Sequence, residues 1–249
     1  MVKDKEFENR NKKMIKSMSK DKQLQKHTES WFLSSHKYEY SYHFTWLGRP
    51  IIQFPQDMIA IQEIIWKIKP DLIIETGIAR GGSLILSASI LELLGKGEVI
   101  GIDKDIREHS KIEVENHKLF KRITMIEGSS VDKKMINKVF SLSKGKKKIL
   151  LFLDSNHSHN HVLKELKAYS PLIIKGSYIV VFDTVIDNLP KNWLKDQGIE
   201  RPWDKTDNPK TAVREFLKTN KRFKIDSSIE NKLLISTAPE GYLRCIKDP

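Results

Sequence analysis

The sequence predicts an α/β fold: a seven-stranded, mostly parallel sheet with helices on both faces and an antiparallel last strand. Five short apolar segments alternate with helical segments of about ten residues, which is the pattern of a parallel sheet. Two further strand-like segments follow one another near the end of the chain and predict an antiparallel hairpin at the sheet edge. At 249 residues and 39% apolar content, the chain is long enough to bury such a core.

The first 45 residues are expected to form a basic, aromatic-rich N-terminal extension (1–45) to a main domain that spans 46–249. Met1–His36 is polar with thinly spaced apolar residues, which predicts one or two surface helices. The aromatic segment Tyr38–Trp46 either packs against the core or lines a ligand cleft. Leu47–Pro55 contains two prolines and is expected to be a loop.

The main domain is expected to begin with a helix over Asp57–Lys69, capped by Gln56 or Asp57 and stopped by Pro70. Strands and helices then alternate along the chain. The expected strands are Leu72–Glu75, Glu98–Asp103, Ile123–Glu127, Lys148–Asp154, Ser177–Asp183, Phe223–Asp226 and Lys232–Ser236. The expected helices are Ser83–Leu94, Ile106–Asn116, Asp132–Ser143, His159–Ser170 and Pro209–Thr219, with an irregular segment over Thr184–Asn208.

Composition and charge disfavour several classes of protein. The net charge is +12, but the lysines are spread along the chain without zinc-finger spacing or an RNP-like motif, so no nucleic-acid partner is expected. The sequence lacks an apolar run of about 18 residues, so we expect no stable insertion into a membrane. The single cysteine, Cys245, rules out an internal disulfide and a cysteine-built metal site. No secretory signal is recognised, and the cytoplasm is the expected compartment.

The segment Asp71–Ser83 (DLIIETGIARGGS) reads as a buried strand, a glycine turn and the start of a helix, which is a nucleotide-binding arrangement. Its pattern is E-x-G-x-x-x-G-G rather than G-x-G-x-x-G. The carboxylate of Glu75 would repel a pyrophosphate but suits a ligand with an amino group and a ribose, such as S-adenosylmethionine (SAM). The alternative is an ordinary strand–turn–helix. The residues expected to contact the cofactor here are Glu75, Gly77, Ala79, Arg80, Gly81 and Ser83.

Polar groups end every one of the five parallel strands, at the edge where such sheets bind ligands. Asp103 is expected to accept hydrogen bonds from ribose hydroxyls. Its alternative role is to cap the next helix, for which Asp105 is better placed. Gly128, Ser129 and Ser130 are expected to border the adenine, or else to form an ordinary capping turn.

Asp154 and Asp183 end adjacent strands, so their carboxylates are expected to approach each other. Two neighbouring carboxylates repel unless a proton or cation is present, and a hard divalent ion such as Mg²⁺ relieves that repulsion. His157 follows Asp154 by one turn and can accept a proton near neutral pH. The structural alternative is that Asp154 caps the next helix and His157 bonds to it.

His159 and His161 also follow this strand, in the segment DSNHSHNH. A zinc site is the alternative for them, but imidazoles at this spacing without a helix are a weak zinc signal. We expect these two histidines to cap and decorate the next helix.

Taken together, these motifs resemble the cephalosporin hydroxylase/rhamnosyl O-methyltransferase family of class I SAM-dependent methyltransferase-like proteins. The resemblance runs from about Trp46 to the end of the chain and leaves the N-terminal extension outside it. The matching segments are Ile73–Arg107, Arg122–Asp132, Leu151–Thr184, Arg201–Leu217 and Ile229–Ile246.

The resemblance implies a Rossmann-like class I methyltransferase fold that binds SAM, with Asp154 also near the cofactor, and often Mg²⁺. Members methylate hydroxyls of sugars or other small molecules, and one branch is named for an antibiotic-tailoring hydroxylation. Related metal-dependent members carry an acidic pair where this chain has Phe182 and Asp183. Asp154 and Asp183 then remain as metal ligands, with water or Asp187 completing the shell.

The predicted function is therefore transfer of a methyl group from SAM to a small-molecule hydroxyl, a sugar first of all. Mg²⁺ on Asp154 and Asp183 would lower the pKa of the hydroxyl, and His157 would remove its proton. Trp203 and its surrounding segment would cover the acceptor. The alternatives are a SAM-binding subunit without catalysis, a tailoring hydroxylase component of the same family, and an NAD-dependent oxidoreductase, which the missing G-x-G-x-x-G disfavours. The aromatic extension leads us to expect a homo-oligomer.

Overall fold

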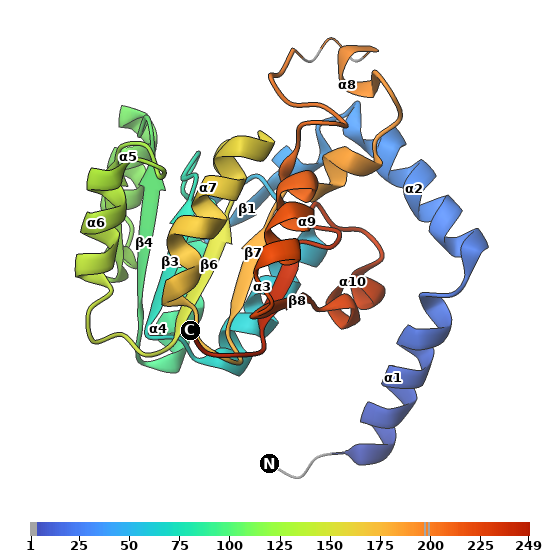
Figure 1. The fold of residues 1–249 in the computed structure, drawn as a ribbon, viewed down its shortest axis with the longest axis horizontal. Helices are drawn as coiled ribbons and strands as arrows, with labels where there is room; N and C mark the ends of the chain where they lie inside the picture. The colour runs from blue at the N-terminus through green and yellow to red at the C-terminus, as the bar shows by residue number, and fades with distance from the viewer. Residues whose placement is uncertain (1–3, 197, 199) are drawn as a thin grey trace.

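The computed structural model describes residues 4–196, 198 and 200–249 (Figure 1). A seven-stranded sheet in the order β5-β4-β3-β6-β7-β9-β8 runs through the described part of the chain. Within this sheet β9 alone runs opposite to the other six strands, which confirms the predicted architecture. The strands are β3 (Leu72–Thr76), β4 (Glu98–Asp103), β5 (Ile123–Glu127), β6 (Ile149–Leu153), β7 (Tyr178–Val181), β8 (Phe223–Ile225) and β9 (Tyr242–Cys245).

Helices cover both faces of the sheet. Helices α3 (Pro55–Ile68) and α4 (Gly82–Leu94) pack on one face, together with Val114 of α5 (Glu108–Glu115). The other face is covered by α6 (Lys133–Leu142), α7 (His159–Tyr169) and α9 (Pro209–Thr219).

The central strands are apolar throughout because both of their faces are buried. In β3, Ile73 packs toward α3 and α4, whereas Leu72 and Ile74 pack toward the opposite layer. All three side chains are 0% exposed. Five parallel strands in this arrangement bring their carboxyl ends to one edge of the molecule, where a ligand site is expected.

The predicted cap of the first domain helix is wrong. Helix α3 starts at Pro55 with Phe54 as its N-cap, because proline fits the first turn, where a backbone N–H has no partner to lose. Asp57 instead lies inside the helix and is fully buried. Its carboxylate accepts hydrogen bonds from Ser236, Thr237 and Tyr242, and so ties α3 to the segment before the last strand.

The predicted strand over Lys232–Ser236 is also wrong. Asp226 caps helix α10 (Ser227–Leu233), and Leu234 then adopts a φ of 62°. The last strand of the sheet is β9, whose Tyr242 and Leu243 are buried, whereas residues 231–235 are only partly buried. The position beside β7 requires a strand that is buried on both faces, and β9 meets that requirement better than the segment Lys232–Ser236 does.

The N-terminal extension contains two surface helices, as predicted: α1 (Lys5–Met18) and α2 (Lys22–His36). Neither helix has a buried residue, and Figure 1 shows them along one side of the sheet domain. A short antiparallel hairpin follows, made of β1 (Phe44–Trp46) and β2 (Arg49–Ile51). The loop expected over 47–55 was therefore wrong in part, because a proline is tolerated in the edge strand β2.

The boundary proposed between residues 45 and 46 falls within β1 and stays a prediction. Across the described residues, no helix combines the length and the apolar character needed to cross a bilayer.

Candidate active site

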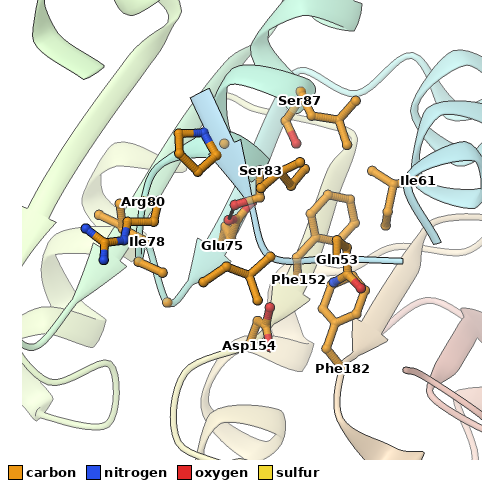
Figure 2. A pocket seen from close by; sticks show the side chains of 17 residues that line it. Gln53, Ile61, Glu75, Ile78, Arg80, Ser83, Ser87, Phe152, Asp154 and Phe182 are labelled. Carbon is orange, nitrogen blue, oxygen red and sulfur yellow. Dashed lines mark hydrogen bonds between the residues drawn. The ribbon is translucent and has the colours of Figure 1, made fainter. Parts of the chain in front are cut away.

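A pocket opens at the carboxyl edge of the sheet, between the glycine turn (residues 76–82) and the ends of β6 and β7 (Figure 2). Its wall combines apolar and polar groups. The labelled lining residues include Gln53, Glu75, Arg80, Ser83, Asp154 and Phe182. The predicted glycine-turn residues Gly77 and Ala79 also line it, so the structure brings most of the expected cofactor contacts into one place.

The glycine turn has a backbone that other residues would rarely adopt. Gly77 has a φ of 91°, and a Cβ placed on it would lie 2.1 Å from the backbone oxygen of Asp154. Gly81 has a φ of 80°, and Ala79 adopts a φ of 46° although it is not glycine. Strained backbone of this kind concentrates at ligand sites, and here the turn closely approaches the backbone of Asp154 at the end of β6.

Glu75 carries an unused hydrogen-bond acceptor into this pocket. Its side chain is 3% exposed, and the hydroxyl of Ser83 donates to Oε1, as Figure 2 shows. Oε2 is buried and has no hydrogen-bond partner among the described residues. Burial raises the pKa of Glu75 to about 7, against the smaller lowering effect of Ser83. An ammonium group bound here would satisfy the free oxygen and favour the ionised carboxylate, which fits the amino-acid end of SAM.

Asp103 faces the glycine turn across the end of β4. Its Oδ2 accepts hydrogen bonds from the backbone N–H of Ile78 at 2.8 Å and of Ala79 at 3.3 Å. The capping role does not apply to Asp103, because α5 begins at Glu108 with Arg107 as its N-cap. Asp105 does not cap the helix either, so that part of the prediction was wrong.

The segment 128–130 forms a turn before α6, and its last hydroxyl points away from the pocket. Gly128 has a φ of 148°, and the carbonyl of Ser129 accepts a hydrogen bond from Asp132. The Ser130 hydroxyl instead donates to Oε1 of Glu165, which is 0% exposed. The carbonyl of Ser130 also accepts a hydrogen bond from the hydroxyl of Tyr169 at 2.6 Å, so both oxygens of Ser130 already have partners within the protein. The expected contact of residues 128–130 with an adenine stays a prediction.

Asp154, His157 and Asp183 converge, as the sequence predicted. Their potential ligand atoms all lie within 4.8 Å of one another, and we refer to the three residues as the acidic–histidine group. His157 Nε2 lies 3.2 Å from Oδ2 of Asp183. Burial, followed by the charges of Asp183 and Glu75, raises the pKa of Asp154 well above its usual range. A divalent cation would relieve this repulsion, so the donor set fits a metal ion.

The capping alternative for Asp154 is not supported, since Ser158 is the N-cap of α7. Asp183 has a φ of 54°, which turns the chain sharply at the end of β7. Phe182 is buried and packs edge-on against Phe152, with ring centroids 6.5 Å apart. Asp187 pairs with Arg214 at 3.1 Å and is not part of the acidic–histidine group.

His159 and His161 have structural partners outside the acidic–histidine group. His159 begins α7, and its ring contacts Thr211 Oγ1 at 2.8 Å and Glu215 Oε2 at 3.0 Å on α9. Both histidines lie on α7 as expected, but the predicted capping role is wrong, because Ser158 is the N-cap of this helix. His161 Nε2 lies 3.1 Å from the Ser130 hydroxyl and 3.4 Å from Oε1 of Glu165. Among the described residues, neither histidine joins a group of three metal-ligating side chains.

Three residues near the site were missed by sequence reasoning. Gln53 lines the pocket just before α3 and accepts a hydrogen bond from Thr237, and no local pattern marks it. Glu165 accepts hydrogen bonds from residues that follow two different strands. The sequence did offer a signal for it, since Glu165 is a charged residue four positions after His161 on an otherwise apolar helix face. His36, at the end of α2, stacks on Trp193, a contact between distant segments that no spacing reveals.

Comparisons with known proteins agree on one family. The family profile described as Rhamnosyl O-methyltransferase/CmcI matches residues 38–246. A rhamnosyl O-methyltransferase of Mycobacterium bovis is 30% identical over 205 residues, which cover 80% of this chain and 77% of that protein. Its counterpart in Mycobacterium leprae is 30% identical over 148 residues, covering 59% of this chain and 62% of that protein.

Solved structures share the fold at low sequence identity. A structure of CmcI with Mg and SAM aligns with a TM-score of 0.57 and 20% identity, covering 82% of this chain and 77% of that one. A putative caffeoyl-CoA O-methyltransferase from Staphylococcus aureus aligns with a TM-score of 0.55 and 18% identity, covering 88% and 91%. These likenesses confirm the methyltransferase-like fold. With the family profile spanning most of the chain, the protein belongs to the rhamnosyl O-methyltransferase/CmcI family.

Proposed function

We propose that the protein is a SAM-dependent, Mg²⁺-assisted O-methyltransferase that acts on a hydroxyl of a sugar or another small molecule. The observation that carries this proposal is the acidic–histidine group beside a pocket into which Glu75 directs an oxygen that has no hydrogen-bond partner among the described residues. Family membership supports it, since the curated relatives are named for methylation of a rhamnosyl group.

The cofactor would be held by the glycine turn and the two carboxylates that flank it. Glu75 would accept from the amino group, with its Oε1 already oriented by Ser83. Asp103 would accept from the ribose hydroxyls, since the N–H groups of Ile78 and Ala79 fix its carboxylate beside the turn. When bound, SAM supplies an electrophilic methyl group on its sulfonium. The turn would orient that end of the ligand toward Asp154, whose backbone it touches.

Asp154 and Asp183 would hold the metal ion. When bound, Mg²⁺ supplies positive charge that lowers the pKa of a neighbouring hydroxyl. Mg²⁺ prefers oxygen ligands, which favours the two carboxylates over the imidazole. His157 is then free to act as the base. Its contact with Asp183 fixes the ring through Nε2 and leaves Nδ1 to take the proton of the acceptor hydroxyl.

We further propose that the enzyme works in the cytoplasm, because a chain with one cysteine has no internal disulfide, as is usual for proteins of that compartment.

The proposal is tested by removing the base and leaving the rest of the site. His157→Ala should lower the rate of methyl transfer from labelled SAM by about 10²–10⁴-fold, the usual cost of a lost general base. Folding, followed by thermal melting, and SAM affinity, followed by calorimetry, should not change. His159→Ala is the matched control, because that ring contacts α9 rather than the acidic–histidine group. Wild-type protein that binds SAM but methylates nothing would favour a non-catalytic subunit.

A further inference from the structure

The end of helix α2 is fixed to the sheet domain by aromatic side chains, although the helix has no buried residue. Phe32 stacks on Phe54 with ring centroids 5.3 Å apart and an interplanar angle of 23°. Trp31 and Tyr40 also pack against Phe54, at 6.3 and 5.7 Å. Phe54 is 5% exposed and directly follows Gln53, which lines the cofactor pocket. The extension is therefore anchored beside the site rather than at a distant surface.

His36, the last residue of α2, continues this contact toward the acidic–histidine group. Its ring stacks on Trp193 of helix α8 (Trp193–Asp196), with centroids 4.6 Å apart and an interplanar angle of 28°. Figure 1 shows α8 and the upper end of α2 close to each other above the carboxyl ends of the strands. The pKa of His36 is lowered by burial and, to a smaller extent, raised by the charge of Asp183. The stacked pair thus lies within electrostatic reach of Asp183.

A second aromatic contact involves the acidic–histidine group itself. The ring of Trp203 meets His157 edge-on, with centroids 4.9 Å apart and an interplanar angle of 82°. The guanidinium of Arg201 lies over the Trp203 ring at 5.5 Å. His157 in turn contacts Asp183. Trp203 therefore contacts the acidic–histidine group directly, and Trp193 of the same segment after β7 is joined to the extension through His36.

We propose that His36, Trp193 and Trp203 form an aromatic wall of the acceptor site, against which the apolar face of a pyranose ring lies while its hydroxyls face Asp183 and His157. This inference rests on the proposed function and assigns the extension a part in acceptor recognition. Aromatic rings offer a flat apolar surface and a polar edge in one side chain. A pyranose presents the complementary pair, a face of C–H groups and a rim of hydroxyls.

The test compares acceptors and variants in the full-length protein. The probes are methyl rhamnopyranoside, methyl glucopyranoside and catechol, each with labelled SAM and Mg²⁺. His36→Ala and Trp193→Ala should each raise the KM for the methylated pyranoside by about three- to tenfold, the effect of losing one aromatic stacking contact. The kcat and the affinity for S-adenosylhomocysteine should stay unchanged. Trp193→Phe should recover most of the lost affinity, since it keeps a flat ring.

His27→Ala is the matched control, because His27 lies on the same helix, is exposed and should leave every constant at its wild-type value. Binding of each pyranoside to the protein loaded with S-adenosylhomocysteine is measured separately by saturation-transfer NMR. Loss of that signal in His36→Ala supports the wall even if no sugar is methylated, in which case the proposed function alone fails.

Normal pyranoside KM in both alanine variants overturns the aromatic wall and leaves the methyltransferase function standing. Methylation of catechol alone, without binding of either pyranoside, also overturns it. Absence of both transfer and binding contradicts the two proposals together.

Discussion

At the scale of single residues, the burial of Glu75 predicts that the stability of the fold depends on pH. Burial raises its pKa from 4.5 to about 7, so the folded state favours the neutral carboxyl. The contribution of the neutral Glu75 carboxyl to folding stability is fully present below about pH 4.5 and is lost as the pH rises through 7. We expect Glu75→Gln to raise the free energy of unfolding at pH 8 by up to about 3 kcal/mol, and to change it little at pH 4.5. Urea unfolding at both pH values measures this, and an equal effect at the two would contradict it.

The same ionisation bears on cofactor binding. An ammonium group near Oε2 favours the charged carboxylate, so the affinity for SAM should increase between pH 6 and 8, in step with the ionisation of Glu75. The Glu75→Gln variant should bind more weakly and lose this pH dependence. Calorimetric titration across that range tests the point. If the affinity of the wild-type protein for SAM does not change with pH, Glu75 does not bind the amino group of SAM.

Asp103 gives a second residue-scale prediction. Asp103→Ala should weaken SAM binding by about 1–3 kcal/mol, the cost of losing hydrogen bonds to a charged acceptor. Asp105→Ala is the matched control, because that neighbouring residue is exposed and its carboxylate has no hydrogen bond to the glycine turn among the described residues. Unchanged calorimetric affinity in Asp103→Ala would remove this residue from the cofactor site.

At the scale of elements, Glu165 joins two strand ends to helix α7. Its Oε1 accepts from Ser130 after β5 and from Ser155 after β6, and the carboxylate is fully buried. Glu165→Ala should lower the free energy of unfolding by about 2–4 kcal/mol, since both hydroxyls lose their shared acceptor inside the protein. Glu215→Ala, at a half-exposed ion pair of α9, should cost less than about 1 kcal/mol. Equal costs in chemical denaturation would show that Glu165 is not a structural junction.

Most elements of the sheet were predictable because their burial is two-sided and their connections are short. Strands β4 and β5 and helix α9 have the predicted bounds. The C-terminal end was harder, since Leu233, Leu234 and Ile235 are as apolar as a strand, yet the Asp226 cap favours a helix there. A local pattern does not say which of two nearby apolar segments reaches the sheet edge.

At the scale of the whole molecule, the rule that parallel strands carry ligands at their carboxyl ends was enough to bring Asp154, His157 and Asp183 together. The roles of Ser130 and His36 were not predictable, because both depend on partners far away in sequence. The hydroxyl of Ser130 bonds to Glu165, which lies 35 positions further along the chain. His36 stacks on Trp193 of a distant segment, while Phe32 of the same helix packs on Phe54.

Helix α1, the first helix of the extension, is expected to contribute little to the stability of the fold. None of its residues is buried, and Phe7 and Met14 are 60% and 58% exposed. Removal of residues 1–18 should change the free energy of unfolding by less than about 1 kcal/mol. If the exposed apolar residues drive self-association, as we expect, the shortened chain should sediment as a smaller species than the full chain. A large loss of stability would instead place α1 within the folding unit.

The central claim is metal-assisted methyl transfer, and its most direct test is the Mg²⁺ dependence of the reaction. Protein treated with EDTA, then supplied with labelled SAM and the best acceptor among the three probes, should transfer methyl at least about 100-fold more slowly than the same protein with added Mg²⁺. Asp154→Asn should respond weakly to the added ion, because one of the two carboxylates is lost. Transfer at the full rate after EDTA treatment would contradict the claim and leave Asp154 and Asp183 without a metal-binding role.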